Sequence, residues 1–361
     1  MFQFSKYQGL GNDFLLIDAR SPAAGPDVSA MAAELVQRLC DRRFGVGGDG
    51  VILALPPREG GEVRMRIFNA DGSEPEMCGN GIRCLARFLA DVDGDGAGRR
   101  WQVETLAGRI VPELLADGTV RVDMGPPFLD PAAVPTTLPV GPAGLPQGEV
   151  EAGGRRFAAA AAGMGNPHLV IPVDDLAAVE LEVLGPALER HPAFPARTNV
   201  HFVQVLAPDH LAMRVWERGA GPTLACGTGA CATLVACRRL GLCAGEARVD
   251  LPGGPLRIEW NGADGSVWMT GPAERVFDGV PAPGLCGPAP AAAPAGAIEI
   301  DCATACVEGC VRPEACASAA ARARVEDLLH GRSLDELVAL ATQSAEARTR
   351  ARLTREDGLG L

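Results

Sequence analysis

Two cysteines of this chain stand in nearly the same local sequence, although they are far apart along it. CGNG occupies residues 78–81 and CGTG occupies residues 226–229, and each precedes an apolar stretch, residues 82–90 and 230–240. We predict that each cysteine begins a buried helix. Free backbone N–H groups and the helix dipole would form a carboxylate site beside the thiol there, and glycines let a ligand approach. The same setting is expected to lower the thiol pKa toward neutrality.

Two such thiols facing each other across a cleft can carry out two-base chemistry. One thiolate removes a proton from one face of a carbon, and the other thiol delivers a proton to the opposite face. The pair shares one proton, and the two roles exchange with the direction of reaction. That is the chemistry of a racemase or epimerase. Buried cysteine also packs as a small apolar residue, which is our interpretation of the remaining cysteines before residue 280: Cys40, Cys84, Cys231, Cys237 and Cys243.

The chain contains an internal repeat that includes both cysteine motifs. Residues 9–17 and 163–171 both read Gly-apolar-Gly-Asn and then an apolar, strand-like run. The triplets at residues 66–68 and 214–216 each lie twelve residues before a cysteine motif. Two pairs of repeated motifs in the same order predict two copies of one domain.

Short apolar runs mixed with helical stretches indicate an α+β fold. We expect strands at residues 14–18, 51–55, 63–68 and 120–123. The expected organisation is a first repeat (1–124), a Pro/Gly-rich link (125–148), a second repeat (149–280), a Pro/Ala linker (281–300) and a Cys-rich helical tail (301–361).

Composition excludes several classes of protein. The 361 residues are 47% hydrophobic and 22% charged, as in globular proteins, and the net charge of −12 argues against nucleic acid as a partner. The chain contains no run of eighteen apolar residues, so we expect no membrane span. Its first residues lack an export signal. We therefore expect a cytoplasmic protein with reduced thiols. Lysine occurs only at Lys6, which argues against pyridoxal phosphate chemistry.

Two further patterns are interpreted as structural. Residues 45–50 (GVGGDG) match the dinucleotide fingerprint by letters, but a helix precedes them and a strand follows, which is the reverse of the required order. We interpret them as a glycine loop. His168 has no second metal ligand at a suitable spacing, and we expect it to be a hydrogen-bonded or core histidine.

The motifs together resemble the diaminopimelate epimerase family. The resemblance implies two pseudo-symmetric domains, each a curled mixed sheet around a central helix, with the active site in the cleft between them. It also implies a cofactor-independent isomerase that interconverts LL- and meso-diaminopimelate for lysine and peptidoglycan precursor synthesis, acting as a homodimer. The matching segments are GLGNDF (9–14), FNADGSE (68–74), MCGNG (77–81), MGNPH (164–168), TNV (198–200), WERG (216–219) and ACGTGAC (225–231).

The resemblance also implies roles for individual residues. Cys78 and Cys226 would be the acid/base pair, and Glu217 would bind the ammonium at the reacting end. The backbone N–H groups of Gly79, Asn80, Gly227 and Thr228 would hold the reacting carboxylate. The distal carboxylate would be held by Asn12, Asn69, Asn166, Asn199 and Arg218. The chain departs from the family pattern at Pro222, where many members carry Glu, and at Gly50, where some carry Gln.

The tail lies outside the resemblance and contains a second cysteine cluster. Cys302, Cys306, Cys310 and Cys316 follow the spacing C-x3-C-x3-C-x5-C, which could hold a metal ion or an iron–sulfur cluster but matches no common pattern. A stripe of small residues on a helix is the alternative, and the tail's partner is open.

Two other functions remain open for the chain as a whole. One is a racemase of the same fold that acts on another amino acid. The other is a thiol redox or metal-binding protein, in which Cys78 and Cys226 form a disulfide switch.

Overall fold

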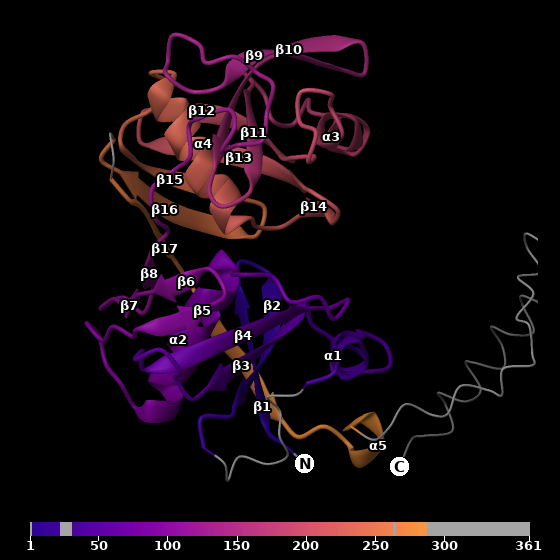
Figure 1. The fold of residues 1–361 in the computed structure, drawn as a ribbon, viewed down its shortest axis with the longest axis vertical. Coiled ribbons are helices and arrows are strands. Elements are labelled where there is room, and N and C mark those ends of the chain that lie inside the picture. Colours follow the sequence, from indigo (N-terminus) through magenta and orange to yellow (C-terminus); the bar gives the residue numbers. More distant parts are fainter. Residues whose placement is uncertain (1, 22–30, 263–264, 287–361) are drawn as a thin grey trace, which may run out of the picture. The chain divides into compact units, whose positions relative to one another are not determined.

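The first half of the chain builds a mixed sheet against one long helix. The structure, a computed structural model, describes residues 2–21, 31–262 and 265–286 (Figure 1). Apolar side chains fill β2 and β3, and both strands are buried along most of their length. The elements are β1 (Phe4–Gly9), β2 (Asn12–Asp18), α1 (Ala33–Cys40), β3 (Gly50–Leu55), β4 (Val63–Asn69), α2 (Gly79–Asp93), β5 (Val103–Thr105), β6 (Gly108–Ile110), β7 (Pro112–Leu114) and β8 (Val120–Asp123).

The second half has the same construction and then returns to the first. Its elements are β9 (Gln147–Ala152), β10 (Arg155–Gly163), β11 (Pro167–Pro172), α3 (Leu181–Glu189), β12 (Asn199–Ala207), β13 (His210–Glu217), β14 (Gly221–Thr223), α4 (Gly227–Arg239), β15 (Glu246–Leu251), β16 (Gly254–Trp260), β17 (Val267–Gly271), β18 (Glu274–Gly279) and α5 (Pro283–Cys286).

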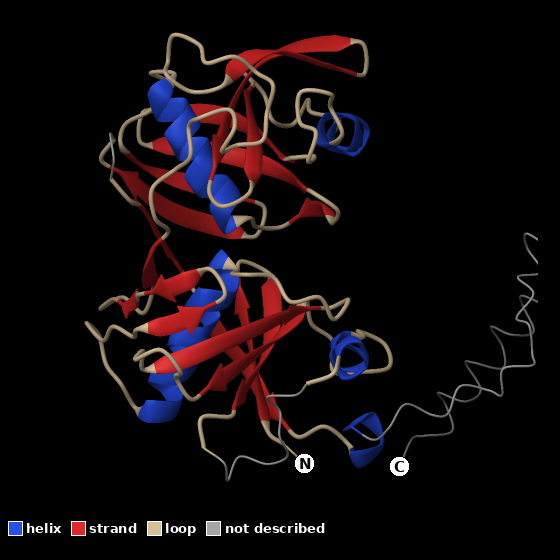
Figure 2. Cartoon of the chain, viewed as in Figure 1, coloured by secondary structure: helices blue, strands red, loops and turns tan. Residues whose placement is uncertain are grey.

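Strand pairing shows how closely the two halves correspond. β2 is parallel to β3 and antiparallel to β1, just as β11 is parallel to β12 and antiparallel to β10. β3 and β4 are antiparallel, as are β12 and β13, and a buried helix follows each pair. The repeated Gly-apolar-Gly-Asn motif forms the turn of each first hairpin, where Gly11 and Gly165 have φ of 82° and 89° that glycine tolerates. The predicted α+β fold with two similar lobes is confirmed (Figure 2).

The central helices are buried on nearly all sides because sheet strands surround them. In α2, Ile82, Leu85 and Leu89 are fully buried, and α4 buries every residue from Gly229 to Cys237. Gly94, directly after α2, caps the helix in the left-handed conformation with a φ of 73°. No helix in the described ranges is long and apolar enough to cross a membrane. Because α2 and α4 are buried in this way, they hold the residues of their first turns in fixed positions.

Two strands near the middle join the lobes. β8 pairs with β17, which places β7 and β8 in an eleven-stranded sheet ordered β7-β8-β17-β16-β15-β13-β12-β11-β10-β9, with β14 on β13. The chain then crosses back, and β18 pairs with β1 at the edge of a seven-stranded sheet, β18-β1-β2-β3-β4-β5-β6. Each sheet therefore contains strands from both halves of the sequence.

Candidate active site

Both repeated cysteines are the residue immediately before a helix. Cys78 has φ −136° and ψ 121°, and Cys226 has φ −131° and ψ 105°, so both are extended N-cap residues. The Cys78 Sγ accepts a hydrogen bond from the Gly81 N–H at 3.4 Å. The Cys226 Sγ lies 3.6 Å from the Thr228 hydroxyl. The prediction that each cysteine begins a buried helix is confirmed.

The two helix starts lie directly against each other. A Cβ atom added to Gly79 would lie 3.7 Å from the Gly227 Cα, and one added to Gly227 would lie 3.6 Å from the Asn80 Oδ1. The side chain of Met269, from β17, is at 3.2 Å from the first of these positions and 2.9 Å from the second. Glycine at both places permits this approach, because any side chain would push Met269 away. The structure thus brings the four predicted N–H donors into one small region.

On the first lobe, a polar network sets the orientation of Asn12. Its Oδ1 accepts hydrogen bonds from the Cys78 thiol at 3.9 Å and from the Asn80 Nδ2 at 3.2 Å. Its Nδ2 donates to the Asp49 Oδ2 at 2.8 Å, and Arg42 holds Asp49 in turn at 2.7 Å. Asp49 belongs to the glycine loop at residues 45–50, and our sequence analysis did not predict it as part of the site.

On the second lobe, Glu217 lies at the end of β13 beside Cys226. The Thr223 hydroxyl donates to the Glu217 Oε1 at 2.6 Å, and the Cys226 side chain is also within hydrogen-bonding distance of the carboxyl group. Burial raises the pKa of Glu217 above its usual value, and the bonds from Thr223 and Cys226 oppose that shift. Thr223 is a second residue that the sequence analysis missed.

The structure accounts for both departures from the family pattern. Pro222 lies in β14 opposite Trp216, at the edge of the sheet, where proline is tolerated, and the strand still places Thr223 at Glu217. Gly50 lies at the start of β3, where an added Cβ would meet the Phe68 carbonyl oxygen at 2.3 Å. A larger residue at position 50 therefore requires a shift of the β3–β4 backbone.

The thiol pKa values contradict the expectation from helix position. Burial raises the pKa of Cys78, although the N–H groups of Gly81 and Asn80 act in the opposite direction. Burial likewise raises the pKa of Cys226 well above its usual value, and the nearby Glu217 carboxylate raises it further. The expectation of near-neutral values was wrong because desolvation of a buried thiolate outweighs the helix-terminal N–H groups. In this state burial therefore favours the neutral thiol at both positions.

Three of the remaining predicted contacts, Asn166, Asn199 and Arg218, lie around β11, β12 and β13. The Asn199 Oδ1 accepts from the Arg218 backbone N–H at 2.9 Å, and its Nδ2 donates to the Pro167 carbonyl at 3.0 Å. The Arg218 guanidinium is exposed and donates to the Ala196 carbonyl at 3.0 Å. Asn199 thus fixes the backbone that connects Glu217 to Arg218.

Asn166 and Asn69 lie at strand ends in different sheets: Asn166 directly before β11, and Asn69 at the end of β4. The Asn166 Oδ1 lies 2.7 Å from the His168 Nε2, and the other ring nitrogen of His168 lies 2.8 Å from His201. His168 is buried and hydrogen-bonded, as predicted. Asn69 is exposed at the end of β4, and its Nδ2 donates to the Ser73 hydroxyl at 3.0 Å. The contacts of Asn69 do not link it to either cysteine.

Metal binding finds no support in the described part of the chain. There, no group of three or more His, Cys, Asp or Glu side chains is arranged to hold a metal ion. The candidates Cys302, Cys306, Cys310 and Cys316 lie outside the described residues.

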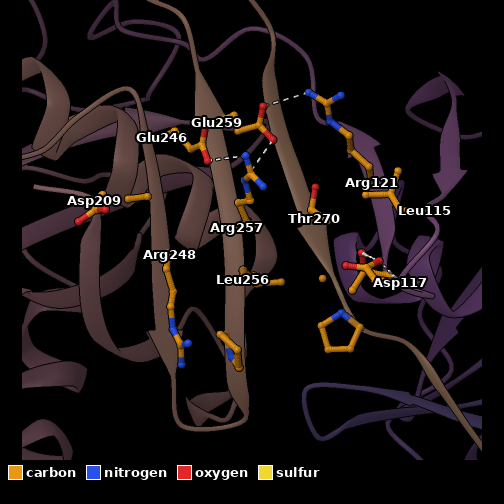
Figure 3. Close-up of a pocket in the computed structure, with 15 residues that line it drawn as sticks. Leu115, Asp117, Arg121, Asp209, Glu246, Arg248, Leu256, Arg257, Glu259 and Thr270 are labelled. Atoms are coloured by element: carbon orange, nitrogen blue, oxygen red, sulfur yellow. Dashed lines mark hydrogen bonds and ion pairs between the residues drawn. The ribbon is translucent and has the colours of Figure 1, made fainter.

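A groove of about 810 Å³ lies over β8, β15, β16 and β17 (Figure 3). Some of its charged side chains pair with one another: Arg121 with Glu259 at 3.1 Å, and Arg257 with Glu246. Neither Cys78 nor Cys226 lines it. We do not assign it to the reaction, because neither of the two predicted catalytic thiols faces it.

Sequence comparison identifies the family to which this arrangement belongs. Residues 4–129 and 160–276 match the sequence profile of diaminopimelate epimerase. The chain belongs to the diaminopimelate epimerase family. It is 61% identical over 283 residues to the diaminopimelate epimerase of Prochlorococcus marinus, with 78% of this chain and 93% of the relative covered. It is 54% identical over 283 residues to that of Acaryochloris marina, with 77% and 98% covered. The predicted family and isomerase class are confirmed.

Solved structures share the fold at low sequence identity. A Bacillus anthracis phenazine biosynthesis protein of the PhzF family superposes with a TM-score of 0.54 at 14% identity, covering 77% of this diaminopimelate epimerase family member and 97% of the other chain. A hydroxyproline epimerase from Agrobacterium vitis superposes with a TM-score of 0.55 at 15% identity, covering 77% and 91%. These likenesses establish the two-lobed fold and no more than the fold.

Proposed function

We propose that this protein interconverts LL- and meso-diaminopimelate by proton transfer at the α-carbon between two cysteines, in the synthesis of lysine and peptidoglycan precursors. The observation that carries the proposal is the contact between the first turns of α2 and α4, each of which begins after a cysteine. Membership of the diaminopimelate epimerase family supports the choice of substrate.

In this proposal the two helix starts bind the reacting end of the substrate. The α-carboxylate accepts hydrogen bonds from the N–H groups of Gly79 and Asn80 on one side and Gly227 and Thr228 on the other. The Glu217 carboxylate binds the α-ammonium. Both helix dipoles have their positive ends at the carboxylate, where negative charge accumulates as the α-proton leaves. Exclusion of water strengthens these interactions.

The proton transfers balance without a cofactor. The thiolate of one cysteine takes the α-proton, and the electron pair of the broken C–H bond stays on the carbon and its carboxylate. The thiol of the other cysteine then gives its proton to the opposite face of that carbon. The configuration is inverted, and the two sulfur atoms have exchanged protonation states, so the reverse reaction uses the same groups.

The distal end of the substrate is assigned to Arg218 and four asparagines. The forked guanidinium of Arg218 suits a carboxylate, and the amides of Asn12, Asn69, Asn166 and Asn199 add hydrogen bonds without charge. An amino acid with a carboxylate at its far end therefore fits better than a short apolar one. A racemase of another amino acid is the alternative function.

The assay is incubation with LL-diaminopimelate in deuterated water and a reducing agent. We expect deuterium at the α-carbon by proton NMR and the meso isomer by chiral chromatography. Proton exchange in another amino acid, with none in diaminopimelate, would favour the alternative racemase. The proposed epimerisation needs reduced thiols, because a disulfide contains no base. An activity of the protein that appears only after thiol oxidation would therefore favour a redox protein.

We also propose that the protein is a homodimer joined at β18. Val276 and Phe277, in this edge strand, are 54% and 43% exposed, and Val280 and Phe44 nearby are 53% and 86% exposed. Exposed apolar side chains beside the free backbone of an edge strand are typical of an association surface.

Changing Phe277→Asp is expected to convert the dimer to a monomer, since a charge would be buried in the apolar contact. Sedimentation velocity of the full-length chain measures the change. Val183→Asp, at a position of α3 that is 60% exposed, is the control and should remain dimeric. A wild-type protein with the mass of one chain would contradict the dimer.

We place the protein in the cytoplasm, where thiols stay reduced. The cysteines of the described residues are all free, and the proposed reaction needs two free thiols.

A further inference from the structure

Arg83, in the second turn of α2, is a charged side chain buried completely. It is 0% exposed, and no ion pair in the described part of the chain involves it. Its guanidinium donates instead to the Gly79 carbonyl at 3.1 Å, the Asn80 Oδ1 at 3.0 Å and the Pro272 carbonyl at 3.3 Å. A buried cation without a carboxylate is costly. Its position directly behind the first turn of α2 therefore calls for an explanation.

The bond from Arg83 determines how the Asn80 amide is oriented. Because the Oδ1 of Asn80 faces the guanidinium, the Nδ2 faces the other way. It donates to the Asn12 Oδ1 at 3.2 Å and to the Ala225 carbonyl at 3.4 Å. Ala225 is the residue before Cys226, and the Asn12 Oδ1 also accepts from the Cys78 thiol. One amide thus connects the surroundings of both sulfur atoms.

Arg83 also holds the chain where it crosses between the lobes. Its Nη1 lies 3.5 Å from the Met269 sulfur in β17, and its Nε bonds Pro272 immediately after that strand. Met269 in turn packs against Gly79 and Gly227. The guanidinium therefore contacts the start of α2 and the crossing strand directly, and the start of α4 through Asn80.

The charge of Arg83 matches what the proposed reaction requires. A pair of thiols that shares one proton carries one negative charge. The guanidinium is the buried positive charge next to it, and its field opposes the burial that raises the pKa of Cys78. The internal repeat places Cys231 at the position equivalent to Arg83, five residues after the second cysteine. At this position, therefore, α2 carries a guanidinium and α4 does not.

We infer that Arg83 is a positioning residue for the thiol pair. Through Asn80 it fixes the two cysteine-bearing helix starts against each other, and its charge balances that of the single thiolate. The inference rests on the proposed two-cysteine reaction. It makes two separate demands on position 83: a positive charge, and a fork that reaches the amide of Asn80. Lysine meets the first demand and not the second.

The test compares Arg83→Met and Arg83→Lys with the wild-type chain. Iodoacetamide alkylation of Cys78 and Cys226 is followed as a function of pH by peptide mass spectrometry, alongside kcat and KM for epimerisation. In Arg83→Met the pH midpoint for Cys78 should rise by about one unit. Its kcat should fall by about 10²-fold with little change in KM, because the groups around the two sulfurs lose their alignment. Arg83→Lys should restore the midpoint but leave kcat about tenfold low.

Arg87→Met is the matched control, one turn further along α2. Arg87 pairs with Asp91 at the surface, so this variant should alkylate and turn over as the wild type does. An Arg83→Met chain with an unchanged midpoint and kcat would overturn the inference. If Arg83→Met fails to fold, Arg83→Lys decides the matter, since a wild-type kcat would exclude positioning through Asn80. A wild-type chain inactive on diaminopimelate would instead contradict the proposed function, while the alkylation midpoints still report on Arg83.

Discussion

Changing either Cys78→Ala or Cys226→Ala is expected to lower kcat/KM for epimerisation by about 10³-fold or more in both directions. Each turnover needs a base on one face of the α-carbon and an acid on the other. Removing one sulfur leaves no group on that face to complete the inversion, because no other side chain in the first turns of α2 and α4 titrates.

Separate measurement of exchange and inversion makes this test sharper. A single variant keeps one thiol, so it should exchange the α-proton of LL- or of meso-diaminopimelate slowly, without inversion, and not of both. Deuterium incorporation and chiral analysis are therefore recorded on the same samples. Cys231→Ala is the control, because Cys231 lies inside α4, five residues beyond Cys226. Inversion within tenfold of the wild-type rate in Cys78→Ala or Cys226→Ala would contradict the two-thiol mechanism.

Changing Glu217→Gln is expected to lower kcat/KM by about 10²-fold. Glutamine keeps the shape of the side chain and can still accept the hydrogen bond from Thr223, but it lacks the negative charge proposed to bind the substrate ammonium. The same change should make Cys226 easier to alkylate at neutral pH. The Glu217 carboxylate raises the pKa of that thiol, so its removal increases the thiolate fraction.

Thr223→Val separates the charge of Glu217 from its orientation. This variant loses only the hydroxyl that donates to the carboxylate at 2.6 Å, and its kcat/KM should fall about tenfold or less. Steady-state kinetics and Cys226 alkylation are measured for both variants. Equal activity in Glu217→Gln and wild type would remove Glu217 from the site.

Local sequence was sufficient to predict the helix starts and the doubled architecture. A cysteine followed by glycines and an apolar run specifies a helix terminus through short-range geometry, and the repeated order of motifs reports on the whole fold. The roles of Asp49 and Arg83 were not predicted, because their contacts are not local in sequence. Asp49 orients Asn12 across 37 positions of sequence, and in the sequence Arg83 is one of several charged residues of α2. Their partners are set only when the strands and the two helices pack together.

The thiol pKa values also could not be predicted from local sequence. The N–H groups at a helix start can be inferred from sequence, but the number of atoms that displace water around a sulfur cannot. At Cys78 and Cys226 burial has the larger effect, and at Cys226 a carboxylate from β13 adds to it. The direction of the shift thus depends on tertiary structure.

The exchange of strands between the two sheets makes each half dependent on the other for its stability. β7 and β8 are built from the first half but complete the sheet of the second, while β18 is built from the second half and borders the first. A chain cut between the repeats would leave both fragments with missing partners and exposed apolar surface. Although the two lobes share one arrangement of strands and helix, we expect them to unfold in a single cooperative thermal transition rather than one after the other.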